Sequence, residues 1–387
     1  PRGAAGAGSE RAEPRFNVPA GWRCFGQLGS GISGHVAAFR LSDGGEHAVK
    51  LVPKVFSSPA TALHIVREMR IMRHVRHPNI VALREVHVDR PGFDDVYLRQ
   101  ELLDTSLQAF VQKSGVALAE KEVRHVLYQM LRGLLCLHTA GILHRDIKPS
   151  NVLCNGSGLV KLADFGSSRV VGAADERELL QQPLLTQYVV TRYYRAPEVV
   201  LALGDYGKPV DIWSVGCILG EVLQQRVLIK GKDSLDQVVR IVRVVGTPAQ
   251  EDLAWIKPGS CALGFLRHCS LDSDGKPFPS TLGQVTAGSP AMAEMLASLL
   301  RFSPDRRLTV REALDHGLFG EFRSEADPFV AAAESTPSFD AGYEDKLLEA
   351  MGRTPFDESP FRREILQVRR ELHASAAARL HGPDPGA

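Results

Sequence analysis

The sequence predicts a two-lobed α+β fold, in which a small, mainly β lobe with one helix precedes a larger, mainly α lobe. Its 387 residues exceed what one compact core of ordinary size holds. Short strand-like segments separated by turns occupy the first part of the chain, whereas apolar residues recur at helical spacing from residue 123 onward. The expected ranges are 1–20 for a disordered N-terminal segment, 21–104 for the N-lobe, 105–320 for the C-lobe, 321–372 for an extension packing on the lobes, and 373–387 for a disordered tail.

Composition excludes several classes of protein. The hydrophobic fraction of 44% and the charged fraction of 24% are typical of a globular protein, and no apolar run is long enough to cross a bilayer. The formal net charge of +1 gives no general reason to expect nucleic acid as a partner. The six cysteines show no C-x-x-C pair and no histidines at metal spacing, which suits reduced thiols in a cytosolic or nuclear protein.

Near the start of the predicted N-lobe, residues 28–36 read L-G-S-G-I-S-G-H-V and contain G-x-G-x-x-G. In a dinucleotide-binding fold the third glycine would open a helix. Here residues 35–41 and 46–52 read as two strands joined by the turn Ser42–Gly45. Strand, glycine turn and strand suit a flap over nucleotide phosphates, because backbone N–H groups without side chains can approach phosphate oxygens closely.

A lysine and a glutamate follow the glycine turn in a specific order. Lys50 lies in A-V-K on the second strand, where a lysine is ordinarily just solvated. Ser58 and Pro59 mark a helix start, with serine as N-cap and proline in the first turn. Glu68 falls in the middle of this helix, where a glutamate is ordinarily just a surface residue. The apolar face of the helix consists of Ile65, Met69 and Met72.

The remaining elements are expected from periodicity. Residues 81–88 and 96–102 read as strands, and residues 104–107 as the connection between the lobes. Apolar residues from Val123 to Leu137 predict a helix that Gly141 ends. Further helices are expected over 209–223 and 361–372. Asp211 in the first of these would be buried and would need hydrogen-bond donors, which the backbone of the loop after Gly141 can supply.

That loop, residues 142–151, reads I-L-H-R-D-I-K-P-S-N, and Asp164-Phe165-Gly166 follows after a short hairpin. H-R-D-x-x-x-x-N followed by D-F-G supplies a carboxylate for a substrate hydroxyl proton and two oxygen ligands for magnesium. A lone H-R-D could be an ordinary salt-bridged turn. The glycine turn, the lysine, the glutamate and D-F-G in the same order favour the catalytic interpretation.

With these motifs in order, the chain from Trp22 to Phe319 resembles a eukaryotic protein kinase. Thr186-Gln187-Tyr188, just before V-V-T-R-Y-Y-R-A-P-E, is similar to the T-x-Y segment of mitogen-activated protein kinases. The stretch V-V-T-R-Y-Y-R-A-P-E-V is especially similar to their stress-activated Jun N-terminal branch. Gln187 stands where that branch has proline, so no branch is assigned.

The resemblance implies a proline-directed serine/threonine kinase that uses ATP and Mg²⁺. Asp146 would orient the substrate hydroxyl and accept its proton, and Lys148 would stabilise the transferring phosphoryl group. Lys50 would hold the α and β phosphates, with Glu68 holding Lys50. Asn151 and Asp164 would bind magnesium. The implied nucleotide-binding residues are Leu28, Gly29, Ser30, Gly31, Ile32, Ser33, Gly34, His35, Val36, Ala48, Lys50, Gln100, Glu101, Leu103 and Leu153.

Within the nucleotide site, the resemblance gives each part a role. Leu28, Val36, Ala48 and Leu153 would sandwich the adenine ring. Gln100 would control the back of the pocket, and Glu101 and Leu103 would offer backbone hydrogen bonds to adenine.

Regulation by phosphorylation of Thr186 and Tyr188 is implied in the same way. A phosphate adds about −1.5 to −2 charge and three acceptor oxygens, so several arginines are needed to order a loop around it. The resemblance places Arg67, Arg145 and Arg169 near Thr186, and Arg192 and Arg195 near Tyr188. A further arginine of the relatives is His64 in this chain. Structural pairing of Glu198 with Arg307 is also implied.

Expected partners are protein substrates with Ser-Pro or Thr-Pro sites, an upstream dual-specificity kinase and phosphatases, but neither nucleic acid nor membrane. We expect a monomer in the cytoplasm, with the nucleus as a further location. An acidic docking patch is typical of the family, yet only Glu325 and Asp327 fall near its place.

Two alternatives remain open. A cyclin-dependent relative activated by a bound subunit would lack a tyrosine two positions after the phosphorylated threonine, so the T-x-Y argues against it. A scaffold that binds nucleotide without transferring phosphate is disfavoured because Lys50, Asp146, Asn151 and Asp164 are all present.

Overall fold

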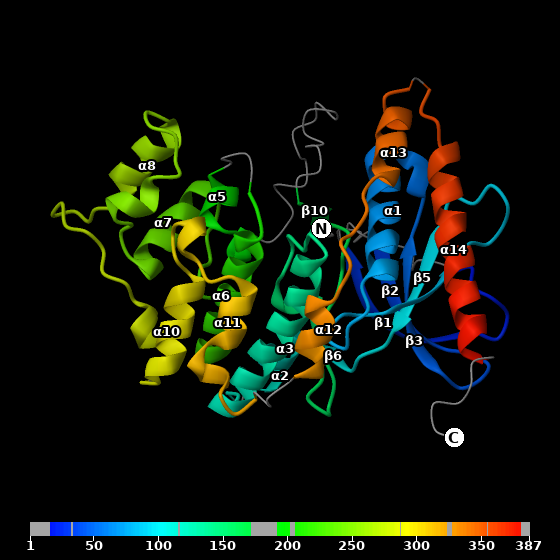
Figure 1. The fold of residues 1–387 in the computed structure, drawn as a ribbon, viewed down its shortest axis with the longest axis horizontal. Helices are drawn as coiled ribbons and strands as arrows, with labels where there is room; N and C mark the ends of the chain where they lie inside the picture. The colour runs from blue at the N-terminus through cyan, green and yellow to red at the C-terminus, as the bar shows by residue number, and fades with distance from the viewer. Residues whose placement is uncertain are drawn as a thin grey trace, which may run out of the picture.

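The structure is a computed structural model that describes residues 16–31, 34–114, 117–171, 192–201, 206–286, 288–322, 327–353 and 355–380. A strand-rich N-terminal lobe and a helical C-terminal lobe lie side by side (Figure 1), which confirms the predicted two-lobed α+β fold. Within the described ranges, none of the helices combines the length and the apolar character needed to span a membrane.

The N-terminal lobe is built on a five-stranded antiparallel sheet in the order β1-β2-β3-β5-β4. Its strands are β1 (Arg23–Gly31), β2 (Gly34–Arg40), β3 (Glu46–Val52), β4 (Leu83–His87) and β5 (Val96–Glu101). The four segments expected as strands agree with β2 to β5 within two residues at either end.

Alternation along β3 places the lysine of the site. Successive side chains of a strand point to opposite faces of the sheet. Val49 and Leu51 join an outer cluster, whereas Val52 joins the main core that includes helix α1 (Pro59–His74). Lys50 shares its face with Val52, so its side chain points toward α1.

The folded region begins at an earlier residue than the sequence indicated. Phe16 and Val18, expected in the disordered N-terminal segment, pack against the outer cluster of the sheet. The backbone N–H of Asn17 also donates to the Tyr97 hydroxyl at 3.0 Å. Two apolar residues are too few to show periodicity, so composition alone placed this boundary too late.

Helix α1 begins and packs as its sequence predicts. Ser58 Oγ accepts a hydrogen bond from the N–H of Thr61 at 3.1 Å, and Pro59 occupies the first helical position. The residues of the predicted apolar face are buried, namely Ile65, Met69 and Met72.

The C-terminal lobe is mainly helical, with two small sheets near the junction of the lobes. The sheets pair β6 (Thr105–Ser106), β8 (Val152–Cys154) and β9 (Val160–Leu162), and β7 (Ile142–Leu143) with β10 (Arg169–Val170). The helices are α2 (Leu107–Ser114), α3 (Glu120–Thr139), α5 (Pro197–Val200), α6 (Pro209–Gln224), α7 (Ser234–Val245), α8 (Cys261–Cys269), α9 (Leu282–Val285), α10 (Pro290–Leu299) and α11 (Val310–Asp315).

After the C-terminal lobe the chain returns to the N-terminal lobe. Helix α12 (Pro328–Glu334) packs on α3, and α14 (Ser359–Leu380) runs along α1 (Figure 1). Helix α13 (Tyr343–Met351) packs on α14 and meets α1 through Glu344. We call the described residues from 327 to 380 the C-terminal extension. The helix expected over 361–372 continues to Leu380, into the predicted disordered tail, because alanine-rich sequence after His373 favours helix.

Candidate active site

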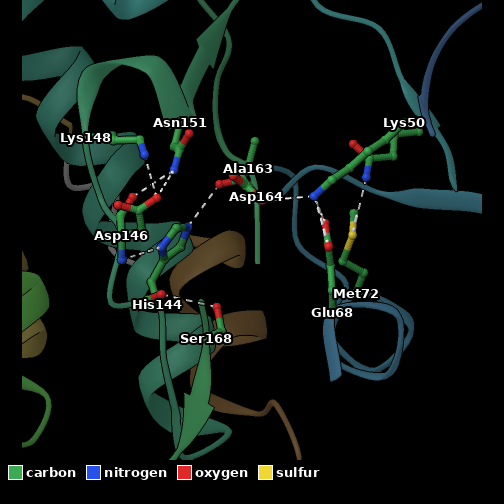
Figure 2. A network of polar contacts seen from close by, with 11 residues as sticks. Lys50, Glu68, Met72, His144, Asp146, Lys148, Asn151, Ala163, Asp164 and Ser168 are labelled. Atoms are coloured by element: carbon green, nitrogen blue, oxygen red, sulfur yellow. Dashed lines mark hydrogen bonds and ion pairs between the residues drawn. The ribbon is translucent and has the colours of Figure 1, made fainter. Parts of the chain in front are cut away.

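Lys50, Glu68 and Asp164 meet at the junction of β3, α1 and the D-F-G segment (Figure 2). Lys50 Nζ lies 2.7 and 2.9 Å from the two carboxylate oxygens of Glu68, and 3.1 Å from Asp164 Oδ1. The Lys50 and Glu68 side chains are only 7% and 4% exposed. The pairing expected from the sequence is therefore formed, and α1 lies in the position that forms it.

Lys50 and Asp164 each stabilise the charge of the other, whereas burial raises the pKa of Glu68 above its ordinary value although Lys50 opposes it. Burial alone would lower the pKa of the Lys50 ammonium, but Glu68 and Asp164 beside it raise that pKa above its ordinary value. Burial would raise the pKa of Asp164, yet the ammonium of Lys50 holds it below its ordinary value. Lys50 therefore stays cationic and Asp164 anionic, as phosphate and metal binding require.

On the facing wall, Asp146, Lys148 and Asn151 form a second cluster (Figure 2). Asp146 Oδ2 accepts from Lys148 Nζ at 2.6 Å and from Asn151 Nδ2 at 3.0 Å. Asn151 Nδ2 also donates to the carbonyl of Asp146 at 2.9 Å. Among the described residues no donor reaches Asp146 Oδ1, which leaves that oxygen for a substrate hydroxyl.

The loop that carries Asp146 is held by Asp211 of α6. Asp211 is fully buried and accepts from the backbone N–H groups of His144 at 2.9 Å and Arg145 at 2.8 Å, and from His138 Nε2 at 2.9 Å. Burial would raise the pKa of Asp211, but these donors hold it below its ordinary value. The predicted role of Asp211 is confirmed, and its charge stabilises Arg145 at a left-handed φ of 67°.

The D-F-G segment packs against the same loop. Phe165 is fully buried, with its ring 5.2 Å from that of His144. Ser168 is buried and donates to the carbonyl of His144 at 3.3 Å. The Ser168 hydroxyl therefore adds a hydrogen bond to the loop that carries Asp146.

A cleft of about 1150 Å³ separates the two walls. The predicted nucleotide-binding residues that line it are Leu28, Gly29, Ser30, Gly31, Gly34, Val36, Ala48, Lys50, Gln100, Glu101, Leu103 and Leu153. His35 is not among the residues that line the cleft, because alternation along β2 turns its side chain away from the side of Gly34 and Val36. Ile32 and Ser33 lie outside the described residues.

The glycines of the flap have different reasons to be glycine. Gly34 has a φ of +118°, and a Cβ there would lie 2.2 Å from the carbonyl oxygen of Leu51. At Gly29 and Gly31 a Cβ would meet nothing within 4 Å among the described atoms. Gly34 is thus required by the sheet, while Gly29 and Gly31 keep the backbone open toward the cleft.

Gln100 lines the cleft, and its Nε2 contacts Met72 Sδ of α1 at 3.6 Å. The backbone N–H of Glu101 donates to the carbonyl of Ala82 at 3.3 Å. The expected contact from Glu101 to adenine must therefore come from its carbonyl oxygen.

The arginines predicted to bind phosphate all line the cleft: Arg67, Arg145, Arg169, Arg192 and Arg195. Burial lowers the pKa of Arg195, and the like charges of Arg192 and Arg145 lower it further, although Asp146 opposes them. Like charges held near one another indicate an anion-binding region.

Two of these arginines have neighbours that the sequence did not reveal. Arg145 Nη2 donates to the Tyr206 hydroxyl at 2.6 Å, with the guanidinium 5.4 Å from the Tyr206 ring centre. Arg192 Nη1 donates to the carbonyl of Lys232 at 2.8 Å. Neither contact leaves a signal in residue spacing.

Arg67 is bound by Glu344 of the C-terminal extension through two hydrogen bonds of 2.8 and 2.7 Å. Thr186 and Tyr188, the predicted phosphorylation sites, lie outside the described residues. Glu344 is a residue that sequence reasoning missed, because 277 positions separate it from Arg67.

The structural ion pair expected between Glu198 and Arg307 is present. Arg307 Nη1 and Nη2 bind the Glu198 carboxylate at 2.6 and 2.7 Å, which confirms that buried pair.

Asp327, which falls near the place of the expected acidic docking patch, is bound within the chain. Asp327 Oδ2 accepts from the Tyr128 hydroxyl at 2.9 Å and from Arg132 Nη1 at 3.1 Å, and its Oδ1 caps α12 through the N–H of Phe329. Because its side chain is only 11% exposed, Asp327 offers little charge to a partner. Glu325 lies outside the described residues.

Comparisons with known proteins agree with this site. Residues 22–319 match the protein kinase domain family. Extracellular signal-regulated kinase 1 of Dictyostelium discoideum is 34% identical over 330 residues, covering 84% of this chain and 60% of that protein. Mitogen-activated protein kinase 6 of Arabidopsis thaliana is 35% identical over 326 residues, covering 83% of this chain and 77% of that protein.

A fungal relative is equally similar. Mitogen-activated protein kinase spk1 of Schizosaccharomyces pombe is 35% identical over 321 residues, covering 82% of this chain and 83% of that protein. The similarity therefore extends over both lobes and across distant organisms. The chain belongs to the protein kinase family and, within it, to the mitogen-activated protein kinases.

Proposed function

We propose that the protein transfers the γ-phosphate of ATP to serine or threonine followed by proline. The observation that carries the proposal is the pairing of two charged clusters across one cleft, Lys50 with Glu68 and Asp164 on one wall and Asp146 with Lys148 on the other (Figure 2). The catalysis asked of these groups is mainly positioning and charge compensation.

The donor set suits Mg²⁺, which prefers one or two protein oxygens together with phosphates and water. Asn151 Nδ2 donates to Asp146, so the amide oxygen of Asn151 is the atom left for a cation. Asp164 is anionic and lines the same cleft. When bound, Mg²⁺ would neutralise charge on the ATP phosphates.

The remaining roles follow from the charges on each wall. Lys50 binds the phosphates of ATP, and Lys148 stabilises charge on the transferred group. Asp146 orients the substrate hydroxyl and takes its proton at the carboxylate.

We propose further that phosphorylation of Thr186 and Tyr188 activates the enzyme. The neighbouring charges of Arg145, Arg192 and Arg195 support this, since a phosphate of about −2 charge would relieve their mutual repulsion. Each pair of opposite unit charges about 4 Å apart contributes on the order of 1 kcal/mol in water and up to about 4 kcal/mol near a protein surface. We expect a monomer in the cytoplasm and nucleus, opposed by phosphatases.

The test is phosphate transfer to Ser-Pro and Thr-Pro peptides, with matched Ser-Ala and Thr-Ala peptides as controls, before and after treatment with a dual-specificity kinase. The proposal predicts transfer to the proline peptides that rises by orders of magnitude on treatment. Equal transfer to the alanine peptides would refute proline direction. No transfer by protein shown by mass spectrometry to carry both phosphates would favour a scaffold.

A further inference from the structure

We infer that Glu344 of α13 is a positioning residue for phosphoryl transfer: by binding Arg67 it holds α1 where Glu68 reaches Lys50. The inference rests on the proposed kinase function and assigns a catalytic consequence to the C-terminal extension.

The contact between Glu344 and Arg67 is both buried and directional. Arg67 Nε donates to Glu344 Oε1 at 2.8 Å and Nη2 donates to Oε2 at 2.7 Å. The two residues are 3% and 5% exposed. A two-point bond of this kind fixes orientation as well as distance.

Arg67 immediately precedes Glu68, so the two share one turn of α1. Adjacent helical residues differ by about 1.5 Å in rise and about 100° in rotation. A helix held at Arg67 can neither slide nor rotate freely. Because Glu68 lies 2.7 Å from Lys50 Nζ, a shift of roughly one ångström would carry the pair beyond hydrogen-bond distance.

Glu344 is itself fixed by its neighbours. The Tyr343 hydroxyl donates to Glu344 Oε1 at 3.1 Å. Burial raises the pKa of Tyr343, so its hydroxyl stays protonated and remains a donor. The guanidinium of Arg70, one turn along α1, lies 5.2 Å from the centre of the Tyr343 ring.

The segment before α13 is anchored to the C-terminal lobe. The N–H of Phe339 donates to the carbonyl of Ala140 at the end of α3, at 2.8 Å. Cys136 Sγ of α3 lies 3.3 Å from Thr336 Oγ1. The extension thus leaves the C-terminal lobe at α3 and reaches α1 within a few residues, where Glu344 of α13 binds Arg67. It can set the position of α1 relative to the catalytic loop.

The chain offers a matched control on the same helix. Arg70 of α1 is bound by Glu364 of α14, and these side chains are 18% and 20% exposed. Ion pairs with access to solvent contribute about 0–1 kcal/mol. Changing Glu364 removes the carboxylate of α14 that binds Arg70 and leaves the pair of Arg67 and Glu344 in place.

The test is a double-mutant cycle measured as kcat and KM on a Thr-Pro peptide, with wild type, Glu344→Gln, Glu68→Gln and the double variant. We expect Glu344→Gln to lower kcat by about tenfold or more, with peptide KM changed less than about twofold. In the Glu68→Gln background, Glu344→Gln should lower kcat by less than about twofold, because the contact between Glu68 and Lys50 through which Glu344 acts is already lost. Glu364→Gln should stay within about twofold of wild type.

A Glu344→Asp variant keeps the charge and should recover part of kcat, and it replaces Glu344→Gln if that protein does not fold. An equal loss of kcat in both backgrounds, or the same loss in Glu364→Gln, would overturn the inference and leave a general role in stability. Absence of transfer by wild type would instead refute the proposed function. The same cycle would then be measured as ATP affinity, where coupling between Glu344 and Glu68 is still expected.

Discussion

The two walls of the cleft are held in different ways. On the C-terminal wall, the loop that carries Asp146 is fastened to Asp211, a buried carboxylate in α6 of the same lobe. On the N-terminal wall, Lys50 is held through Glu68, and the helix that carries Glu68 packs against α14 and is bound by Glu344 of α13, both from the far end of the chain.

This difference indicates which wall can be regulated. Contacts of the C-terminal wall join elements of one lobe and are formed once that lobe folds. Helix α1 is also bound through Arg67 to a separate part of the chain, and such a contact can open at lower free energy than the global fold. We therefore expect changes in the C-terminal extension to alter catalysis without altering the catalytic loop.

The largest effect should follow from breaking the C-terminal wall at its reacting group. Asp146→Asn keeps the size of the side chain but removes the proton acceptor, so kcat should fall by about 10² to 10⁴-fold. Peptide KM and the free energy of unfolding should change little, and steady-state kinetics with thermal unfolding would measure both. Retention of more than about a tenth of kcat would assign proton transfer to another group.

The next effect concerns Asp211, the carboxylate that supports the C-terminal wall, and the quantity affected is stability. Asp211→Asn removes the charge that accepts from His144, Arg145 and His138. We expect the free energy of unfolding to fall by about 4 kcal/mol, as when a buried ionic network loses one partner. Urea unfolding measures it, with Asp236→Asn as the control, since Asp236 pairs near the surface with Arg240. A similar small loss in both variants would show that the loop is held otherwise.

The flap of the N-terminal wall gives a third comparison. Gly34→Ala forces a Cβ against the carbonyl of Leu51 at a positive φ, so the free energy of unfolding should fall by about 3 kcal/mol. Gly29→Ala should leave stability within about 0.5 kcal/mol, because its Cβ would meet nothing nearby. Equal melting temperatures for the two variants would contradict the different roles of these glycines.

A pH-dependent contact also joins the N-terminal wall to the extension. His77 lies after α1, and its Nε2 is 3.1 Å from the carbonyl of Phe329 in α12. Burial lowers the pKa of His77 from 6.5 to about 4. Below pH 6.5 the unfolded chain therefore binds a proton that the folded chain does not, and stability falls as the pH drops toward 4.

For His77 alone, the loss between pH 7 and pH 5 should be about 2 kcal/mol. His77→Gln keeps a donor for the Phe329 carbonyl but does not titrate, so the stability difference between wild type and variant should change by that amount. Urea unfolding at both pH values measures it. A difference that is independent of pH would show that His77 titrates normally in the folded protein.

Sequence reasoning located the residues of the cleft but not what holds them. Lys50, Asp146 and Asp164 were found because their neighbours in the chain form motifs with a fixed chemical purpose. Glu344 and Tyr206 were missed because contacts between distant segments produce neither periodicity nor spacing. The ends of the folded region were misplaced for a related reason, since Phe16 gains its partners only when the sheet has formed.

The most direct test of the difference between the walls is amide hydrogen exchange of wild type and Glu344→Gln. If α1 is held by the extension and the catalytic loop by its own lobe, exchange should quicken across residues 59–74 and stay unchanged at His144 and Arg145. Equal acceleration at both places, or none at α1, would contradict the account.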